Sequence, residues 1–220
     1  MKRPVIVLGY GGHARVLLEV LRMQKVEVLA VVDPGLDSDI CQPKKVEYKV
    51  LSSDNEVLYF PPNQVYLVNG LGSVDVGNRR QFLFQKFKCH GYIFKNVIHP
   101  SAVLSSNLQF GEGIQIMAGA VIQPGSKLGN NVLVNTGVVI DHDCTVGDHV
   151  HIAPGTVISG SVNVGKGTHI GTGAKIINNI SIGANCTIGA GAVVIDKVPS
   201  DARVAGVPAK IIGMNRPKEE

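Results

Sequence analysis

The 220-residue chain has no tryptophan and few aromatic residues (5%), and its basic residues form no run interleaved with aromatic side chains. The absence of such a run excludes a nucleic-acid track, so we expect no nucleic-acid partner. The dispersed Lys and Arg residues that give the net charge of +4 instead suit a small molecule that bears phosphate. Few aromatics beside 26 glycines exclude a conventional mixed core and favour many tight, regularly spaced turns.

Long apolar stretches and paired cysteines are also missing. No stretch approaches the roughly 18 to 20 apolar residues of a membrane-spanning helix, so we expect no membrane insertion. Cys41, Cys89, Cys144 and Cys186 show no CxxC spacing, and no signal peptide precedes the first strand-like run, PVIVLG. We therefore expect a cytoplasmic protein whose cysteines are reduced and structural.

The second half of the chain has a repeat of six residues. A helix would need a period of 3.6 and a free strand a period of 2, so a period of 6 with glycines indicates short strands separated by sharp turns. Cys144 and Cys186 each stand two residues before an apolar position, where we expect buried packing side chains. The apolar residues follow one another at seventeen positions without an insertion: Ile98, Leu104, Phe110, Ile116, Ile122, Leu128, Val134, Ile140, Val146, Ile152, Ile158, Val164, Ile170, Ile176, Ile182, Ile188 and Val194.

Glycine adds a longer period to this repeat. Gly111, Gly129, Gly147, Gly165 and Gly183 recur once in every third hexapeptide, as expected if three hexapeptides make one triangular turn. The pattern predicts a parallel β-helix of nearly six coils, and it resembles the left-handed hexapeptide-repeat architecture of acyltransferases. We assign residues 96–220 to this domain, with a C-terminal cap, and expect so short a prism to associate through its flat sides.

Residues 1–95 carry a different pattern. The stretch PVIVLGYGGHARVLLEVLRMQKVEVLAVVDP predicts a strand, a glycine turn, a helix and a second strand, which is one β-α-β unit. Gly9, Gly11 and Ala14 satisfy the G-x-G-x-x-A fingerprint, whose glycines let the backbone approach a pyrophosphate, and Asp33 stands where it can bind a ribose or base. Because the second mononucleotide half is missing, a half-Rossmann-like unit for a nucleotide-activated sugar fits better than an NAD domain.

A further strand and helix are expected in the stretch VYLVNGLGSVDVGNRRQFLFQKF. Asn69 and Gly70 lie at the carboxyl end of the expected strand, where open α/β sheets bind ligands. The helix begins near Arg79. Two interpretations of Arg79 and Arg80 stay open, as contacts to a phosphate or as solvated helix arginines.

Residues 139–151, VIDHDCTVGDHVH, concentrate charge within a repeat of apolar and small residues. A histidine with an ordinary pKa of about 6.5 is mostly neutral at neutral pH, so His142 is the candidate general base. Asp143 would fix the tautomer of His142 and stabilise its imidazolium form. No serine or cysteine pairs with His142, which favours direct transfer over a covalent acyl-enzyme. Asp148 and His149 are interpreted as bystanders.

The motifs GYGGHAR, VVDP, NTGVVIDHDC, GDHVHIAPG and AGVPAKII resemble the sialic-acid and bacillosamine type of bacterial sugar acyltransferase. The resemblance covers essentially the whole chain. It implies a homotrimer that transfers acetyl from acetyl-CoA to the 4-amino group of a nucleotide-linked amino-dideoxy sugar for surface glycans. Relatives that use UDP-, GDP- or dTDP-sugars, or that acetylate a sugar hydroxyl, leave open both the nucleotide and the choice between N- and O-acetylation.

The resemblance also assigns residues to the site, and it implies no metal. His142 matches the general base and Asp143 its acidic neighbour. The nucleotide-sugar positions are Gly11, Gly12, His13, Asp33, Pro34, Gly70 and Asn135. The acetyl-CoA positions are His151, near the thioester, and Gly160, Thr172 and Ala190.

The spacing of two of these residues bears on assembly. His142 and His151 are separated by one and a half sides of the triangle, so we expect them to face different ways within one chain. Across a threefold axis they could line one cleft. The active sites are therefore expected between the subunits of the trimer.

Three functions of other kinds compete with this interpretation, and the residues favour each of them less. A zinc hydratase built on the same β-helix could ligate metal with His151 and His169, which are three hexapeptides apart and hence on adjacent coils. An NAD-binding regulatory module would depend on the G-x-G-x-x-A fingerprint alone. A sugar nucleotidyltransferase with a β-helix tail would need a far larger N-terminal domain than residues 1–95.

Overall fold

The computed structural model describes residues 3–35, 47–72 and 79–215, and the chain divides into two compact units, Met1–Val97 and Ile98–Glu220. The first unit is a parallel α/β fold and the second is a β-solenoid, as the two halves of the sequence predict. Within the described ranges, no helix is both long enough and apolar enough to cross a membrane.

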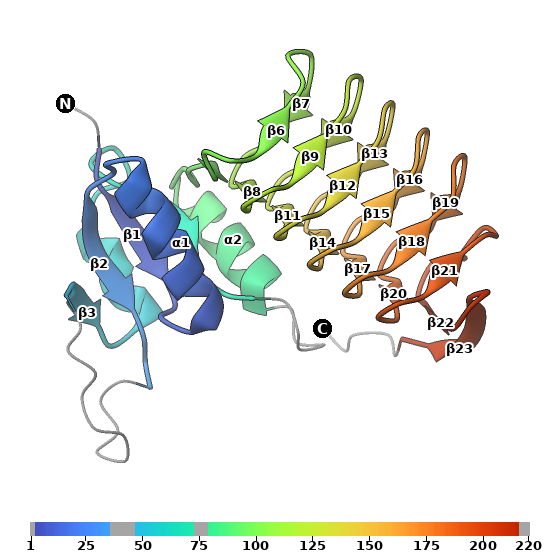
Figure 1. Ribbon diagram of the computed structural model, residues 1–220. Coiled ribbons are helices and arrows are strands. Elements are labelled where there is room, and N and C mark those ends of the chain that lie inside the picture. The colour runs from blue at the N-terminus through green and yellow to red at the C-terminus, as the bar shows by residue number, and fades with distance from the viewer. Residues whose placement is uncertain (1–2, 36–46, 73–78, 216–220) are drawn as a thin grey trace. The chain divides into compact units, whose positions relative to one another are not determined.

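The α/β unit has a four-stranded parallel sheet with strand order β3-β2-β1-β4 (Figure 1). Because β2 and β3 lie on one side of β1 and β4 lies on the other, the strand order reverses between β1 and β4. Its elements, in chain order, are β1 Val5–Leu8, α1 Gly12–Met23, β2 Val28–Val32, β3 Lys49–Leu51, the 3₁₀ helix η1 Asp54–Tyr59, β4 Tyr66–Asn69 and α2 Arg79–Cys89.

The two helices of this unit cover opposite faces of the sheet. Alternate side chains of a strand point to opposite faces. Ile6 of β1 packs with Phe87 of α2 in one apolar cluster. Val7 faces the other way and lies beside Ala14 of α1, since both would touch a Cβ built on Gly70. With both faces covered, the carboxyl ends of the strands form the edge from which the connecting loops leave.

The solenoid consists of three sheets whose strands up to β21 are parallel and two residues long, and Figure 1 shows the strands of successive coils stacked along it. The first sheet contains β6 Val103–Leu104, β9 Val121–Ile122, β12 Val139–Ile140, β15 Val157–Ile158, β18 Lys175–Ile176 and β21 Val193–Val194. The second contains β7 Gln109–Phe110, β10 Lys127–Leu128, β13 Thr145–Val146, β16 Asn163–Val164 and β19 Ser181–Ile182. The third contains β5 Val97–Ile98, β8 Gln115–Ile116, β11 Leu133–Val134, β14 His151–Ile152, β17 His169–Ile170 and β20 Thr187–Ile188, and ends with β22 Ala202–Ala205 and β23 Lys210–Met214.

The register between coils follows the predicted period of three hexapeptides. Val139 pairs with Val157, and His151 pairs with His169, each through a parallel ladder. Three corners join the sheets: the first corner leads from the first sheet to the second, the second corner from the second to the third, and the third corner from the third back to the first.

The solenoid core is built as the repeat predicts. All of the seventeen apolar positions are buried except Ile98, Leu104 and Phe110 near the N-terminal end, which are partly buried against the same core. Cys144 and Cys186 are buried in it as well, so their prediction as packing residues is confirmed.

Glycine occupies the second corner because the backbones of adjacent coils approach closely there. A Cβ on Gly147 would lie 2.7 Å from the backbone nitrogen of Lys166 and 3.0 Å from its Cα. Contacts below about 3 Å to rigid backbone cannot be relieved by a side-chain movement. The glycines that recur once per coil are therefore required by close packing between coils.

A different position in the turns requires positive φ. It is the third residue after a buried apolar position, and it holds Gly155 at φ 68°, Asn131 at 55°, Asp143 at 58° and His149 at 61°. This left-handed conformation favours glycine and, among other residues, Asn and Asp. Asp143 therefore lies in the same kind of turn position as the glycines and asparagines of other coils.

The last coil ends with an antiparallel pair of strands. The six-residue spacing stops before Pro199, after which β22 pairs with β20 and β23 returns antiparallel along β22. Ala202 and Val204 of β22 are buried in the solenoid core.

Gly147→Ala is expected to lower the free energy of unfolding by about 1 to 3 kcal/mol, because the new methyl group collides with the backbone of the next coil. Gly119→Asn is the control: it has positive φ, a Cβ there meets no described atom within 4 Å, and Asn occupies the same position elsewhere. Urea unfolding of both variants measures the difference. Equal midpoints for Gly147→Ala and the wild type would contradict the packing explanation.

Candidate active site

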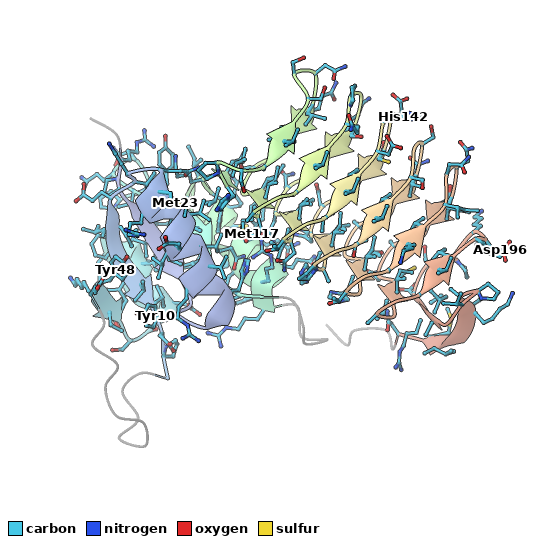
Figure 2. The ribbon with its side chains drawn as sticks, in the orientation of Figure 1. Tyr10, Met23, Tyr48, Met117, His142 and Asp196 are labelled. Carbon is cyan, nitrogen blue, oxygen red and sulfur yellow. The ribbon has the colours of Figure 1, made fainter. Side chains whose placement is uncertain are left out.

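His142 and Asp143 form a hydrogen-bonded pair at the first corner, in the turn between β12 and β13. His142 Nδ1 lies 2.9 Å from Asp143 Oδ2, and the two side chains are 59% and 66% exposed. Figure 2 shows His142 at the tip of its turn, outside the stacked strands. The structure thus brings together the predicted base and its predicted acidic neighbour.

The electrostatics of this pair favour a basic imidazole. The hydrogen bond that His142 Nδ1 donates to the Asp143 carboxylate raises the pKa of His142, and the negative charges of Asp141 and Asp143 raise it further. A carboxylate only accepts hydrogen bonds, so Nδ1 carries a proton in this pair. In the neutral ring, the lone pair is then on Nε2, which is the atom able to accept a proton from a nucleophile.

Backbone hydrogen bonds from the coils on both sides hold the turn. Asp143 N–H donates to the carbonyl of Pro124 at 3.0 Å, and Ser161 N–H donates to the carbonyl of His142 at 2.9 Å. Asp141 Oδ1 accepts from His142 N–H at 2.8 Å. The two exposed side chains therefore project from a turn whose backbone is fixed.

Gly160 lies against the imidazole of His142. A Cβ at this position would be 2.5 Å from His142 Nε2 and 2.6 Å from Cε1. Gly160 is not among the residues with positive φ, so its backbone does not require glycine. The missing side chain instead leaves the space that the His142 ring occupies. The sequence assigned Gly160 to acetyl-CoA binding and gave no sign of this contact.

Cys144 is not placed as a nucleophile, because its thiol is buried and turned toward the backbone of the next coil. Its Sγ donates to the carbonyl of Ser159 at 3.2 Å, and the residue is buried. Burial raises the pKa of the thiol, which lowers the fraction of reactive thiolate.

His151 lies elsewhere on the solenoid. It is on β14 of the third sheet, and this sheet is opposite the first corner of the triangle, where His142 lies. Its ring contacts the ring of His169 on the adjacent coil, with centroids 4.8 Å apart and planes at 77°. Burial lowers the pKa of His169, and among the described residues its Nδ1 has no hydrogen-bond partner. In those same residues, no group of three or more His, Cys, Asp or Glu could hold a metal ion.

The remaining predicted solenoid residues gather at the third corner. Asn135 follows β11, Thr172 follows β17 and Ala190 follows β20. Thr172 and Ala190 lie in adjacent coils, since Gly191 N–H donates to the carbonyl of Thr172 at 2.8 Å. Within one chain, His142 and Gly160 therefore lie at the first corner, whereas Asn135, Thr172 and Ala190 lie at the third corner. The outer face of the first sheet separates the two corners.

In the α/β unit, the predicted nucleotide-sugar residues lie at the carboxyl edge of the sheet. Gly11, Gly12 and His13 follow β1, Asp33 and Pro34 follow β2, and Gly70 follows β4. Because the three strands are parallel neighbours, these positions are brought to one edge, at the point where the strand order reverses.

The glycines at this edge have two different physical causes. A Cβ on Gly70 would collide with the carbonyl of Leu8 at 2.8 Å and with Ala14 Cβ at 2.9 Å. A Cβ on Gly11 or Gly12 would meet no described atom within 4 Å. Packing therefore explains Gly70, whereas Gly11 and Gly12 leave open space at the N-terminus of α1, where backbone N–H groups favour an anion.

Arg80 is a structural residue that the sequence interpretation missed. The alternative of a solvated helix arginine is wrong for Arg80, which is buried. Its Nη1 donates to the carbonyls of Asn69 and Leu71 at 2.9 and 2.8 Å, on either side of Gly70. Burial lowers the pKa of its guanidinium to about 9, which still leaves a cation at neutral pH. Arg79 is the exposed member and pairs with Asp54 at 3.2 Å.

A solenoid of hexapeptides with a His–Asp pair at one turn, preceded in the chain by a small parallel α/β unit, is the architecture of a hexapeptide-repeat transferase. Two family models match the chain. Residues 125–160 and 161–196 match the bacterial transferase hexapeptide (six repeats), and residues 4–84 match the PglD N-terminal domain.

Several solved structures are similar over nearly the whole chain. PerB from Caulobacter crescentus, in complex with CoA and GDP-perosamine, has 36% identity and a TM-score of 0.87, covering 97% of this chain and 99% of PerB. The acetyltransferase domain of PglB from Neisseria gonorrhoeae, in complex with acetyl coenzyme A, has 32% identity and a TM-score of 0.86, covering 96% and 100%. WeeI from Acinetobacter baumannii has 25% identity and a TM-score of 0.79, also covering 96% and 100%. No curated protein sequence matches at a significant level.

These matches extend over both units of the chain. The chain belongs to the PglD-type family of hexapeptide-repeat sugar N-acetyltransferases.

Asp143→Asn is expected to move the acidic limb of the pH profile of kcat/KM to lower pH. The carboxylate raises the pKa of His142, so its loss lets the imidazole stay neutral at lower pH. The plateau rate should nevertheless fall, by part of the roughly 10²- to 10⁴-fold that a general base contributes. Asp148→Asn, in the neighbouring turn, is the matched control and should leave the limb in place. An acidic limb unmoved by Asp143→Asn would contradict the assigned pair.

Gly160→Ala is expected to lower kcat about 10- to 100-fold, because the new methyl group displaces the His142 ring from its position. The affected atoms belong to an exposed side chain, so the urea midpoint should change little. Steady-state kinetics and urea unfolding of the same preparation give both quantities. A variant with the wild-type kcat would show that the space above Gly160 is not needed.

Proposed function

We propose that this protein transfers the acetyl group of acetyl-CoA to the 4-amino group of a nucleotide-linked amino-dideoxy sugar used for surface glycans. The observation that carries the proposal is the 2.9 Å contact between His142 Nδ1 and Asp143 Oδ2 at an exposed solenoid turn. PerB, which was crystallised with CoA and GDP-perosamine, and the PglB domain, crystallised with acetyl coenzyme A, support the choice of substrates. Variants of the Caulobacter enzyme with one histidine replaced were crystallised with the same two ligands.

The proposed reaction is a direct transfer. The amine nitrogen attacks the thioester carbonyl, and His142 Nε2 accepts the proton that the amine loses. The tetrahedral intermediate collapses by breaking the carbon–sulfur bond, and the imidazolium returns the proton to the departing thiolate. Asp143 stabilises the imidazolium through the interval between these two proton transfers. The buried thiol of Cys144 takes no part.

We assign the two substrates to different parts of the chain. Residues 1–95 bind the nucleotide sugar, and residues 96–220 bind acetyl-CoA and hold the base. The open space at Gly11 and Gly12, beside the N-terminus of α1, supports a diphosphate there. His13, Asp33, Pro34 and Gly70 complete this edge. In the solenoid, Asn135 is assigned to the acceptor sugar. Acetyl-CoA is assigned to His151, Gly160, Thr172 and Ala190.

We further propose a trimer of left-handed solenoids with active sites between subunits. Within one chain, His142 and Gly160 lie at the first corner, whereas Thr172 and Ala190 lie at the third. A neighbouring copy would supply the missing set. The outer face of the first sheet between these corners is a column of valines with one lysine: Val103, Val121, Val139, Val157, Lys175 and Val193. Val103 is 61% and Val157 37% exposed, which leaves an apolar face available for burial against another subunit.

The assay follows the thiol released from acetyl-CoA with UDP-, GDP- and dTDP-linked 4-amino sugars as acceptors. His142→Ala should lower kcat by about 10²- to 10⁴-fold on the best acceptor, as expected for loss of a general base. His149→Asn is the matched control, since Asn occupies the same turn position in other coils, and it should keep the rate. Thiol release by His142→Ala at the wild-type rate would contradict the proposal. The absence of thiol release by the wild type with all three acceptors would also contradict it.

A further inference from the structure

We infer that Ser126, a buried residue outside the candidate active site, is a positioning residue for the His142–Asp143 pair. The inference rests on the proposed function, because it concerns the geometry of the same base. Ser126 is 0% exposed and precedes β10, in the coil adjacent to the turn that holds the pair.

The Ser126 hydroxyl binds both ends of that turn. Its Oγ donates to the carbonyl of Asp141 at 2.9 Å, and it accepts from the N–H of Cys144 at 3.1 Å. Asp141 and Cys144 are the residues immediately before and after the pair. One side-chain oxygen therefore fixes the backbone at the start and at the end of the turn.

The pair depends on this backbone because its side chains are mostly exposed and are held by little packing beyond the contact of the His142 ring with Gly160. His142 and Asp143 are both more than half exposed, so their orientation is set by the peptide units that carry them. Removing the hydroxyl would leave the Cys144 N–H without its partner in a buried position, where an unpaired donor is costly. The turn would relax to recover a hydrogen bond, and the distance between Nδ1 and the carboxylate would change with it.

A hydroxyl is not a general feature of the position that Ser126 occupies in each coil. The equivalent residues of successive coils are Leu108, Ser126, Cys144, Val162 and Ile180. Ser126 is the only hydroxyl among them, and it stands one coil before the His142 turn. A fully buried hydroxyl in an apolar column lowers stability unless it is hydrogen-bonded, so its two bonds account for its presence.

The same arrangement occurs once more without a catalytic pair. Thr168 Oγ1 donates to the carbonyl of Gly183 at 2.9 Å and accepts from the N–H of Cys186 at 3.0 Å. The residues between Gly183 and Cys186 are Ala184 and Asn185, neither of which belongs to the candidate site. Thr168 therefore offers a control with the same hydrogen bonds and a different turn.

The test compares Ser126→Ala with Thr168→Val, because each removes one hydroxyl and leaves the same two backbone groups without a partner. We expect similar losses of thermal stability in both. Only Ser126→Ala should lower kcat, by about 10- to 100-fold, with KM for both substrates changed less than about 3-fold. Its kcat/KM profile should also show an acidic limb at lower pH, since a displaced Asp143 raises the pKa of His142 less. Ser126→Thr should restore kcat, because threonine makes both bonds at position 168.

The outcomes separate this inference from the proposed function. Wild-type kcat in Ser126→Ala, with kcat lost in His142→Ala, would overturn the positioning role and leave the function standing. Equal losses of kcat in Ser126→Ala and Thr168→Val would also overturn it, because the effect would then be one of general stability. Wild-type kcat in His142→Ala would instead overturn the function. If Ser126→Ala does not fold, Ser126→Cys replaces it: a weakly bonding thiol should lower kcat, and an unchanged kcat would contradict the inference.

Discussion

The parallel ladder between coils is the interaction on which the rest of the solenoid depends. Each strand is too short to be stable alone, and it is held by hydrogen bonds to the equivalent strands of the coils before and after it. This register places every sixth side chain in the core. It also stacks each turn on the equivalent turn of the coil before, so that both lie at the same corner. The close approach of glycines at the second corner and the turn of the His–Asp pair at the first both follow from it.

In the candidate site, the backbone of the turn is ordered by hydrogen bonds, whereas its two functional side chains are exposed. The turn at residues 141–144 is fixed by hydrogen bonds from the coils on both sides, while the His142 and Asp143 side chains extend into solvent. If His142 is the base that we propose, its accessible and already oriented ring would lose little entropy when substrate arrives. Gly160 and Ser126 support this arrangement by opposite means, one by leaving space and the other by filling a buried position with a hydroxyl.

How far the sequence could predict this structure depends on which contacts a residue makes. The buried apolar positions and the buried cysteines were predicted because they follow from the six-residue repeat. The His142–Asp143 pair was predicted because its two residues are adjacent in the sequence. Ser126 contacts its partners in the next coil of the solenoid, and Gly160 meets a ring in another coil, so neither role has a local signal. The solvated interpretation of Arg80 was wrong because its burial depends on how α2 packs against the end of β4. The meeting of His142 with His151 stays a prediction, since it needs a second chain.

The positive-φ position in each turn has a consequence for how such a protein acquires chemistry. Gly, Asn, Asp, His and Ser all occupy it along the described solenoid, and the residues other than glycine stand at the first and second corners. A carboxylate can appear beside a histidine at one of these positions without any new loop being built. The same backbone turn thus carries Asp143 beside His142 in one coil and Ser161 and Asn179 in the next two, while the ladder between the coils continues unchanged.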